Sequence, residues 1–278
     1  MFKVLSKRNL NNFVTEMVIE APDVAASADA GQFIILRVDE EGERVPFTIA
    51  DFDREAGTIR IMFQIVGSST QKLNSVNEGE YIQDLVGPLG KATETKGLKK
   101  VAVIGGGVGC AIAFPVAKKL HNQGTVVHLI AGFRNKDLLI LEDEMKEVSD
   151  KLIIVTDDGS YGTKGLVTDA LEKLILSGEE YDEVFAIGPL VMMKFVSLLT
   201  KKYNVKTTVS MNTIMIDGTG MCGGCRLRVG GEMKFACVDG PDFDGHLVDF
   251  DGAIKNSVKY RDRENKKRED SCNLYKKG

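Results

Sequence analysis

A change in the spacing of apolar residues near residue 96 divides the chain into two kinds of structure. After KGLKK (96–100), continuous apolar runs such as VAVIGGG (101–107) alternate with segments of helical spacing such as LVMMKFVSLLTKKY (190–203). Strands that alternate with helices predict a parallel sheet with helices packed on its faces. We therefore expect a Rossmann-like α/β domain over residues 97–206, in which LLILEDEMKEV (138–148) forms one of the helices.

Residues 1–96 follow a different pattern, with short β-rich segments separated by turn residues. The clearest segments are VTEMVIEAP (14–22), GQFIILRV (31–38) and GTIRIMFQIV (57–66), whereas VGPLG (86–90) predicts a turn. The alternation and spacing favour an antiparallel sheet or a small β-barrel. The fold class expected is thus a β-barrel plus an α/β domain, followed by a small Gly- and Cys-rich lobe over residues 207–278.

Length, composition and charge limit the function classes. The 278 residues suffice for two ordinary domains and a small appendage, and 43% hydrophobic with 27% charged residues is typical of a globular protein. A net charge of −4 gives no reason to expect nucleic acid or an anionic membrane as a partner. The start, MFKVLSKRNLNNF, does not resemble a secretory signal, and the most apolar run (101–117) is too short and Gly-rich to span a bilayer. We expect a cytoplasmic protein.

A glycine turn follows the first strand of the predicted α/β domain. GGGVG supplies Gly105, Gly106, Gly107 and Gly109, and it opens a helix, where backbone N–H groups can receive a dinucleotide pyrophosphate. Cys110 stands where the G-x-G-x-x-G motif has its third glycine, and a turn without a ligand would also explain the pattern. GFRNKDLL (132–139) and IGPLVMMK (187–194) end two further strands at the same expected edge, which favours a nucleotide site.

Two segments of the first region carry residues suited to a flavin. ERVPFTIAD (43–51) brings together Arg44, Phe47 and Thr48, which could pair with a phosphate, lie along a ring and bond a heteroatom. From these residues alone, a hairpin with Pro46 at its edge and a half-buried Phe is the favoured interpretation. IVGSSTQKL (65–73) offers a second phosphate cradle or an ordinary helix N-cap, through Gly67, Ser68, Ser69 and Thr70.

The cysteines of IDGTGMCGGC (216–225) and KFACVDG leave three interpretations open. Cys222, Cys225 and Cys237 could bind structural zinc together with His246. A thioredoxin-like C-x-x-C fits poorly because two glycines separate the cysteines. The third interpretation is iron–sulfur: Asp217 completes D-x4-C-x2-C-x11-C, in which a carboxylate takes the first position of the plant-type spacing.

These residues resemble a known family over nearly the whole chain. It is the branch of the ferredoxin–NADP reductase superfamily that contains the electron-transfer subunits of dihydroorotate dehydrogenase and, more similar still, the small subunits of NADH-dependent reduced ferredoxin:NADP oxidoreductases. The segments that carry the resemblance are GQFIILRVDEEGERVPFTIADFD, FQIVGSSTQKL, VGPLGK, GGGVG, GFRNKDLL, TDDGSYGTKG, GPLVMMK, MIDGTGMCGGCR and KFACVDGPDFDGH.

The resemblance implies three domains with three cofactors. They are an FAD-binding β-barrel (1–96), an NAD(P)-binding α/β domain (97–206) and a [2Fe–2S] lobe with a charged tail (207–278). It implies metal ligation by Asp217, Cys222, Cys225 and Cys237. For FAD and NAD(H) it implies contacts from Arg44, Phe47, Thr48, Ile49, Gly67, Ser68, Ser69, Thr70, Gly105, Gly106, Gly107, Gly109, Arg134, Asp158, Gly188, Pro189 and Met192.

Two positions separate this chain from its relatives. The superfamily's R-x-[YF]-[ST] arrangement would place Arg where this chain has Val45, so that Arg44 lies one residue further back. Subunits of the dihydroorotate type have Cys where this chain has Asp217. Cys110 and Cys272 are expected to be a buried and an exposed thiol.

The function implied is electron transfer between NAD(H), FAD and a [2Fe–2S] cluster. The resemblance implies a heterodimer with a larger flavin and iron–sulfur subunit, through which ferredoxin and NADPH take part in electron bifurcation. The alternatives are a partner that oxidises dihydroorotate and a zinc-stabilised nucleotide-binding module without redox activity. Arg134 and Lys136 could meet a 2′-phosphate, although the resemblance implies NADH.

Overall fold

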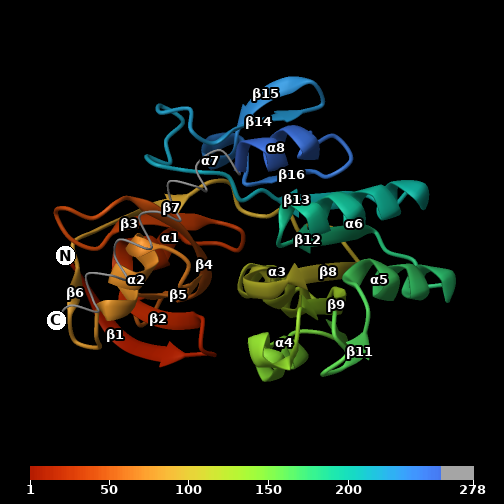
Figure 1. The fold of residues 1–278 in the computed structure, drawn as a ribbon, viewed down its shortest axis with the longest axis horizontal. Helices are drawn as coiled ribbons and strands as arrows, with labels where there is room; N and C mark the ends of the chain where they lie inside the picture. The colour runs from red at the N-terminus through yellow and green to blue at the C-terminus, as the bar shows by residue number, and fades with distance from the viewer. Residues whose placement is uncertain (258–278) are drawn as a thin grey trace.

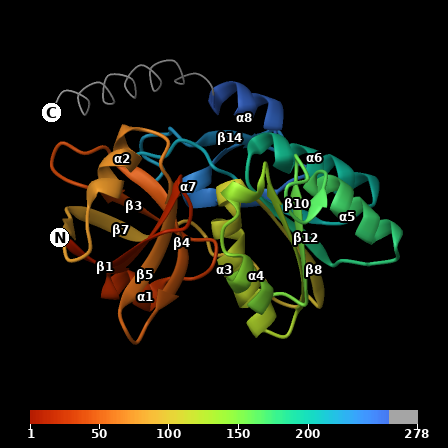
Figure 2. The ribbon, with the colours of Figure 1, turned by 60° about the horizontal axis from the view of Figure 1, so that its bottom comes forward.

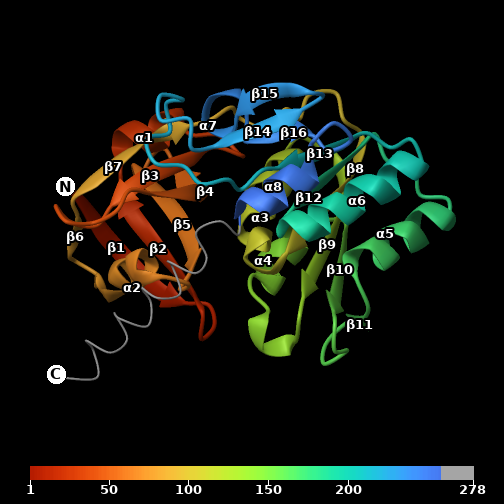
Figure 3. The ribbon, with the colours of Figure 1, turned by 45° about the horizontal axis from the view of Figure 1, so that its top comes forward.

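The computed structural model describes residues 1–257, which form two large sheets and a small third part (Figure 1). The first sheet comes from the N-terminal region, and the second from the region after residue 96. The third part, drawn in blue, lies across the top of both in Figures 1 and 3. The predicted fold class is confirmed.

The first sheet has seven antiparallel strands and curls into a barrel. Strands β6 and β7 lie at opposite ends of the strand order, yet only Gln83 separates them in the chain, so the sheet has to curve back on itself. In spatial order the strands are β6 (Tyr81–Ile82), β1 (Phe2–Asn9), β2 (Val14–Glu20), β5 (Thr58–Gln64), β4 (Val45–Asp53), β3 (Phe33–Arg37) and β7 (Asp84–Leu89). Two short helices accompany them, α1 (Pro22–Ser27) and α2 (Ser68–Ser75).

The second sheet is parallel except at one edge. Its order is β11 (Thr163–Lys164), β10 (Lys151–Thr156), β9 (Val126–Phe133), β8 (Lys100–Gly106), β12 (Glu183–Ile187), β13 (Thr207–Ser210) and the antiparallel β16 (Asp242–Asp244). The chain moves outward from β8 in both directions, which makes the end of β8 the switch point where open α/β sheets bind ligands.

Helices cover both faces of this sheet (Figure 2). Helices α3 (Cys110–Asn122) and α4 (Glu142–Glu147) pack on the face toward the barrel, and α5 (Val167–Leu176) and α6 (Leu190–Lys202) pack on the other. Two 3-10 turns, Gly107–Gly109 and Lys136–Leu138, follow β8 and β9.

The third part consists of a hairpin and two helices. Strands β14 (Arg226–Val229) and β15 (Glu232–Phe235) pair with each other, followed by α7 (Ala236–Asp239) and, after β16, by α8 (Phe250–Ser257). Although the segment after residue 206 is predicted as a separate lobe, β13 and β16 complete the edge of the α/β sheet. The domain boundaries at residues 96 and 206 stay predictions.

Two local expectations are wrong. The first four residues of VGPLG end strand β7, because Val86 pairs with Ile35 and Leu89 with Phe33, with an irregularity in the register at Gly87 and Pro88. The helix expected over 138–148 begins only at Glu142, since Leu141 adopts a left-handed φ of 59° and Ile140 and Leu141 are buried in the core beside α3. Burial of these two apolar residues takes precedence over helical spacing.

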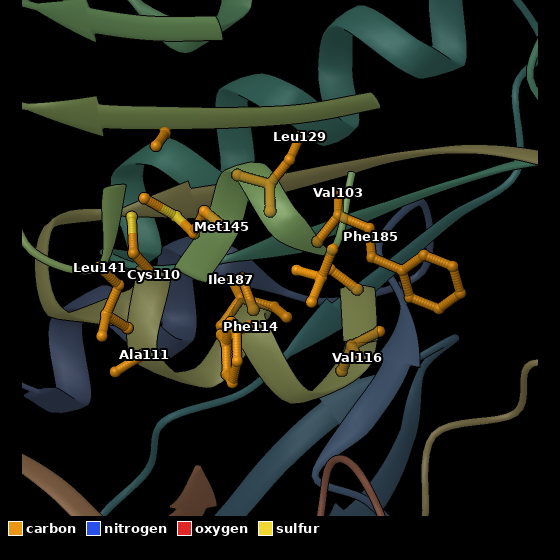
Figure 4. Packing of buried hydrophobic residues seen from close by; sticks show 14 of the residues in the cluster. Val103, Cys110, Ala111, Phe114, Val116, Leu129, Leu141, Met145, Phe185 and Ile187 are labelled. Atoms are coloured by element: carbon orange, nitrogen blue, oxygen red, sulfur yellow. The ribbon is translucent and has the colours of Figure 1, made fainter. Parts of the chain in front are cut away.

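Cys110 is the buried thiol that the sequence predicts. It lies fully enclosed at the start of α3, near Leu141 and Met145 in the core (Figure 4). Burial raises the pKa of Cys110 to about 12, so the thiol stays protonated and packs as a small apolar group. Cys272 and the charged tail lie outside the described residues.

Candidate functional site

The glycine turn after β8 is fixed by close packing. A Cβ on Gly105 would lie 2.8 Å from Cys110 Cα, and one on Gly109 would lie 2.5 Å from the carbonyl oxygen of Ile187. Gly107 differs, because its φ is +56° and no atom lies within 4 Å of the Cβ position. Only this glycine therefore faces open space, which leaves the backbone accessible to a phosphate.

The start of α6 packs directly against this turn. A Cβ on Gly106 would lie 2.5 Å from Met192 Sδ and 3.0 Å from Pro189 Cδ, and one on Gly188 would lie 3.1 Å from Gly106 Cα. The predicted residues Gly106, Gly188, Pro189 and Met192 are thus brought together at the ends of β8 and β12. These four residues fill the space between the end of β8 and the end of β12.

Arg134 and Asp158 lie on the next two strand ends along the same edge. The N–H of Asp158 donates to the carbonyl oxygen of Arg134 at 3.3 Å, and both residues are exposed. The hydroxyl and N–H of Ser160 donate to Asp158 and hold the pKa of that carboxyl below its usual range. The structure therefore places a cation and a carboxylate on the rim beyond the glycine turn.

A cleft lies where the barrel, the α/β domain and the third part meet. Its lining residues come from β3, β4, α3, β13 and the segments around 211–215 and 241, and they are Phe33, Pro46, Phe47, Thr48, Ile112, Ser210, Met211, Asn212, Met215 and Pro241. The lining is largely apolar with a few hydroxyl and amide groups, which suits one edge of a planar aromatic ring system.

Strand β4 divides its residues between the cleft and the barrel interior. Thr48 pairs with Phe33 and Pro46 pairs with Ile35, on the face that meets the third part. Phe47, in edge contact with Phe63, and Ile49 are buried in the barrel core instead. Phe47 nevertheless borders the cleft together with Thr48 and Pro46, and Pro46 is not among the predicted flavin contacts.

The second predicted phosphate cradle lies at the N-terminus of α2. Thr70 Oγ1 accepts hydrogen bonds from the N–H groups of Val66 and Gly67, both at 3.0 Å, so this hydroxyl closes the first turn of the helix. Ser69 Oγ donates to Glu43 Oε2 at 2.8 Å. Gly67 and Ser68 complete the turn, and no atom lies within 4 Å of the Cβ position of Gly67.

Arg44 reaches the cysteine-rich segment rather than the α2 turn. Its Nε donates to the carbonyl oxygen of Ile216 at 3.0 Å across 172 residues of sequence. Ile216 directly precedes the predicted ligand Asp217. No sequence signal indicated this contact, because it joins two domains.

Asp217 organises the segment that leads to the first cysteine. Its Oδ1 accepts from the N–H of Thr219 and its Oδ2 from the N–H of Cys222, both at 2.7 Å. These bonds, that from Thr219 above all, hold the pKa of Asp217 below its usual range, so the side chain is a carboxylate. Asp217 therefore offers the negative charge that the predicted ligand needs, and its ligation stays a prediction.

The cysteines lie in two groups. The sulfurs of Cys225 and Cys237 lie 3.2 Å apart in the core beneath the segment, whereas Cys222 is exposed and accepts a hydrogen bond from the N–H of Gly224. Burial, followed by the neighbouring Cys225, raises the pKa of Cys237 to about 12. A buried thiol pair of this kind becomes a thiolate pair only when a metal supplies positive charge.

This arrangement fits a two-metal cluster better than a single ion. Within residues 1–257, no three Cys, His, Asp or Glu side chains are grouped to hold one metal ion. His246, the fourth ligand of the zinc alternative, bonds to Thr200 on α6 through Nε2 at 3.0 Å. The four predicted ligands lie in two pairs, Asp217 with the N–H of Cys222 and Cys225 with Cys237, and a centre with two irons would take one pair on each iron.

Comparisons with known proteins agree with a nucleotide site in the α/β domain and with an iron–sulfur site in the cysteine-rich segment. Residues 103–198 match the oxidoreductase NAD-binding domain family, and residues 212–249 match the iron–sulfur cluster binding domain of dihydroorotate dehydrogenase B. The predicted cofactors, FAD, an iron–sulfur cluster and NAD(H), are confirmed.

Full-length relatives extend the match. The dihydroorotate dehydrogenase B (NAD(+)) electron transfer subunit homolog of Thermotoga maritima is 45% identical over 94% of this chain and 92% of its own. The corresponding electron transfer subunit of Streptococcus mutans is 32% identical over 88% of this chain and 96% of its own. A solved structure from work on flavin-based electron bifurcation by the NADH-dependent reduced ferredoxin–NADP oxidoreductase superposes with a TM-score of 0.92 at 43% identity, covering 98% of both chains.

These matches confirm the resemblance stated from the sequence. Among the described helices, none has the length and apolar character needed to cross a membrane, and the cytoplasmic location stays a prediction. The chain belongs to the family of dihydroorotate dehydrogenase B electron transfer subunits and their homologues, within the ferredoxin–NADP reductase superfamily.

Proposed function

We propose that this chain is the electron-transfer subunit of an NADH-dependent reduced ferredoxin:NADP oxidoreductase. It passes electrons between NAD(H), FAD and a [2Fe–2S] cluster and delivers them to a larger partner subunit. The observation that carries the proposal is Asp217, a carboxylate at the first ligand position of a segment that otherwise supplies three cysteines. A second support is the similarity to the oxidoreductase structure at 98% coverage.

The nucleotide is assigned to the turn after β8. Gly107 leaves its backbone open on the outer side, while Gly105, Gly106 and Gly109 permit the close approach of β8, α3 and β12 that shapes the turn. The start of α3 adds the partial positive charge of a helix N-terminus. Arg134 and Asp158 on the rim are proposed to contact the ribose end.

The flavin is assigned to the barrel and the cleft. Pro46 and Thr48 present one wall and Met211 and Met215 another, so the ring would be held apart from water. Gly67, Ser68, Ser69 and Thr70 at the α2 N-terminus are proposed to hold its phosphates. When bound, the flavin exchanges hydride with nicotinamide and single electrons with the cluster, which links a two-electron carrier to a one-electron carrier.

The chain contributes placement rather than acid–base groups. Hydride transfer needs rings held in register and not a proton donor, and packing of the barrel against α3 supplies that register. Cys222, Cys225, Cys237 and Asp217 are proposed to hold the cluster, with the N–H of Gly224 donating to Cys222 and so favouring its thiolate. Five cysteines cannot furnish further clusters, so ferredoxin and NADPH are proposed to react through the partner.

The second candidate is the electron-transfer subunit of a dihydroorotate dehydrogenase. It is favoured by the names of the relatives from Thermotoga maritima and Streptococcus mutans. Asp217 favours the first candidate, because the resemblance implies Cys at this position in subunits of the dihydroorotate type.

The test is anaerobic purification of the tagged chain at native expression level together with its partner. We expect flavin absorption bands, a reddish-brown iron–sulfur envelope and two irons per chain, along with a larger subunit that couples NADH, ferredoxin and NADP. Coupling to dihydroorotate instead would select the second candidate. A colourless protein with stoichiometric zinc would refute both.

A further inference from the structure

Two contacts attach the predicted cluster segment to the barrel. The first is the hydrogen bond from Arg44 Nε to the carbonyl oxygen of Ile216, at 3.0 Å. The second is the packing of the barrel around Gly218. Its φ is +78°, and a Cβ there would lie 2.6 Å from Leu89 Cδ1 and 2.8 Å from Ile35 Cδ1, so a side chain is excluded. These contacts flank Asp217 on both sides.

The barrel side of this attachment is continuous with the cleft. Arg44 directly precedes β4, on which Pro46 and Thr48 line the cleft two and four residues later. Ile35 and Phe33 of β3 share one apolar core with Cys225 and Cys237. The strands that line the cleft and the segment that carries Asp217 are therefore one packed unit.

We propose that Arg44 is a positioning residue for the iron–sulfur segment and not a ligand of the flavin phosphate. This inference rests on the proposed function. Through Ile216, Arg44 fixes Asp217 relative to β4, and its guanidinium places a permanent positive charge beside the residue that precedes Asp217. A cation at this position stabilises the extra electron on a reduced cluster and so raises the reduction potential.

The chemistry of Arg44 suits this role better than phosphate binding. Its Nε is already engaged by a carbonyl, which leaves less of the planar fork for the bidentate contact that phosphate favours. Its neighbour Glu43 turns the other way and accepts a hydrogen bond from Ser69 at the α2 turn. Glu43 thus contacts the α2 turn, whereas Arg44 contacts the cysteine-rich segment.

The test compares Arg44→Gln and Arg44→Lys with the control Arg54→Gln in the flavin- and cluster-loaded complex. Arg54 is a matched arginine, since its side chain also bonds to backbone carbonyls, those of Ala26 and Ala28, but within the barrel. Four quantities are measured: the FAD-to-protein ratio, the EPR spectrum of the reduced cluster, its reduction potential and amide hydrogen exchange over residues 212–222.

We expect Arg44→Gln to speed exchange over 212–222 severalfold, broaden the EPR spectrum and shift the potential to a more negative value, with FAD unchanged. Arg44→Lys keeps the charge, so the potential stays near that of the parent while exchange still rises. Arg54→Gln changes neither. If Arg44→Gln instead loses FAD while exchange and the EPR spectrum are unchanged, or if nothing changes, the inference is wrong.

The parent protein separates this outcome from the proposed function. A parent without flavin or cluster defeats the proposed function before any variant is compared. Hydrogen exchange over 212–222 still reports on Arg44 in that case, because the bond to Ile216 is made by the polypeptide alone.

Discussion

The glycine turn at 105–109 and the cysteine segment at 216–225 are both rich in glycine, but they use it differently. In the turn, backbone and side-chain atoms within 3 Å of the Cβ positions of Gly105, Gly106 and Gly109 leave no alternative residue. In the segment, Met221 is 89% exposed and Cys222 lies on the surface. Protein packing therefore sets the shape of the nucleotide turn. In the segment, packing fixes Gly218 against Leu89 and Ile35, whereas hydrogen bonds to Asp217 and, in the proposed function, metal ligation set the shape of the rest.

The largest effect is expected from Gly109→Ala. The added methyl would meet the carbonyl oxygen of Ile187 at 2.5 Å and Gly188 Cα at 2.7 Å, and neither backbone can yield without separating α3 from β12. We expect a loss of about 3 kcal/mol or more in the free energy of unfolding, measured in urea, and loss of NAD(H) binding. Gly107→Ala is the control for the free energy of unfolding only, because Gly107 itself faces the proposed phosphate site: its strain is that of a positive φ, about 1 kcal/mol. Equal losses for the two variants would contradict a turn fixed by packing.

Replacing one cysteine in each region should show that only the cysteine segment holds the iron–sulfur cluster. Cys225→Ala removes one of two facing buried sulfurs, so we expect iron and sulfide content to fall to near zero while NAD(H) binding persists. Cys110→Ala, in the core beside the glycine turn, should cost about 1–2 kcal/mol of stability through a small cavity and leave iron content unchanged. Iron and acid-labile sulfide assays decide the matter, and iron loss from Cys110→Ala would refute the assignment.

Two substitutions of Asp217 should affect the cluster to different degrees. Asp217→Cys keeps an anionic ligand and should retain a [2Fe–2S] centre with an altered potential, whereas Asp217→Ala removes both the ligand and the hydrogen bonds from Thr219 and Cys222. We expect Asp217→Ala to lose or destabilise the cluster. An unchanged EPR signal and potential in Asp217→Ala would show that another group binds the metal.

Local patterns predicted those parts of the molecule that local physics determines. The alternation of strand and helix patterns correctly predicted the α/β sheet, and the segments with a period of two predicted most of the barrel. VGPLG was misassigned because pairing with β3, a contact with a strand about fifty residues earlier, outweighs its turn residues.

The site shows the same limit more sharply. The spacing of Asp217 and the cysteines is local and could be counted from the sequence. Other features depend on how the barrel, the α/β sheet and the third part pack together. They are the bond between Arg44 and Ile216, the place of Pro46 in the cleft and the direction of the Phe47 ring into the barrel core. One sequence without a structure carries no signal for such contacts, apart from the β-strand alternation that puts Pro46 and Phe47 on opposite faces.

The smallest effect concerns Asp242, which joins the segment between barrel and α/β sheet to strand β16 at the sheet edge. Thr93, in the segment between barrel and sheet, donates to Asp242 Oδ2 at 2.6 Å. Burial raises the pKa of Asp242 to about 6, although hydrogen bonds from Thr93 and Ser210 act in the opposite direction. The folded protein therefore keeps a proton that the unfolded chain has already lost, and stability falls as the pH rises from about 4 to 6.

Asp242→Asn removes this titration while keeping an oxygen that can accept from Thr93. The stability of the variant relative to the parent should rise by about 1 kcal/mol between pH 5 and pH 7, measured as urea midpoints in the cofactor-loaded protein. Asp244→Asn on the same strand is the control, because that side chain is exposed, and it should show no such trend. Should the two variants follow the same pH dependence, the carboxyl of Asp242 would not be the group that couples protonation to the junction of linker, sheet and cluster segment.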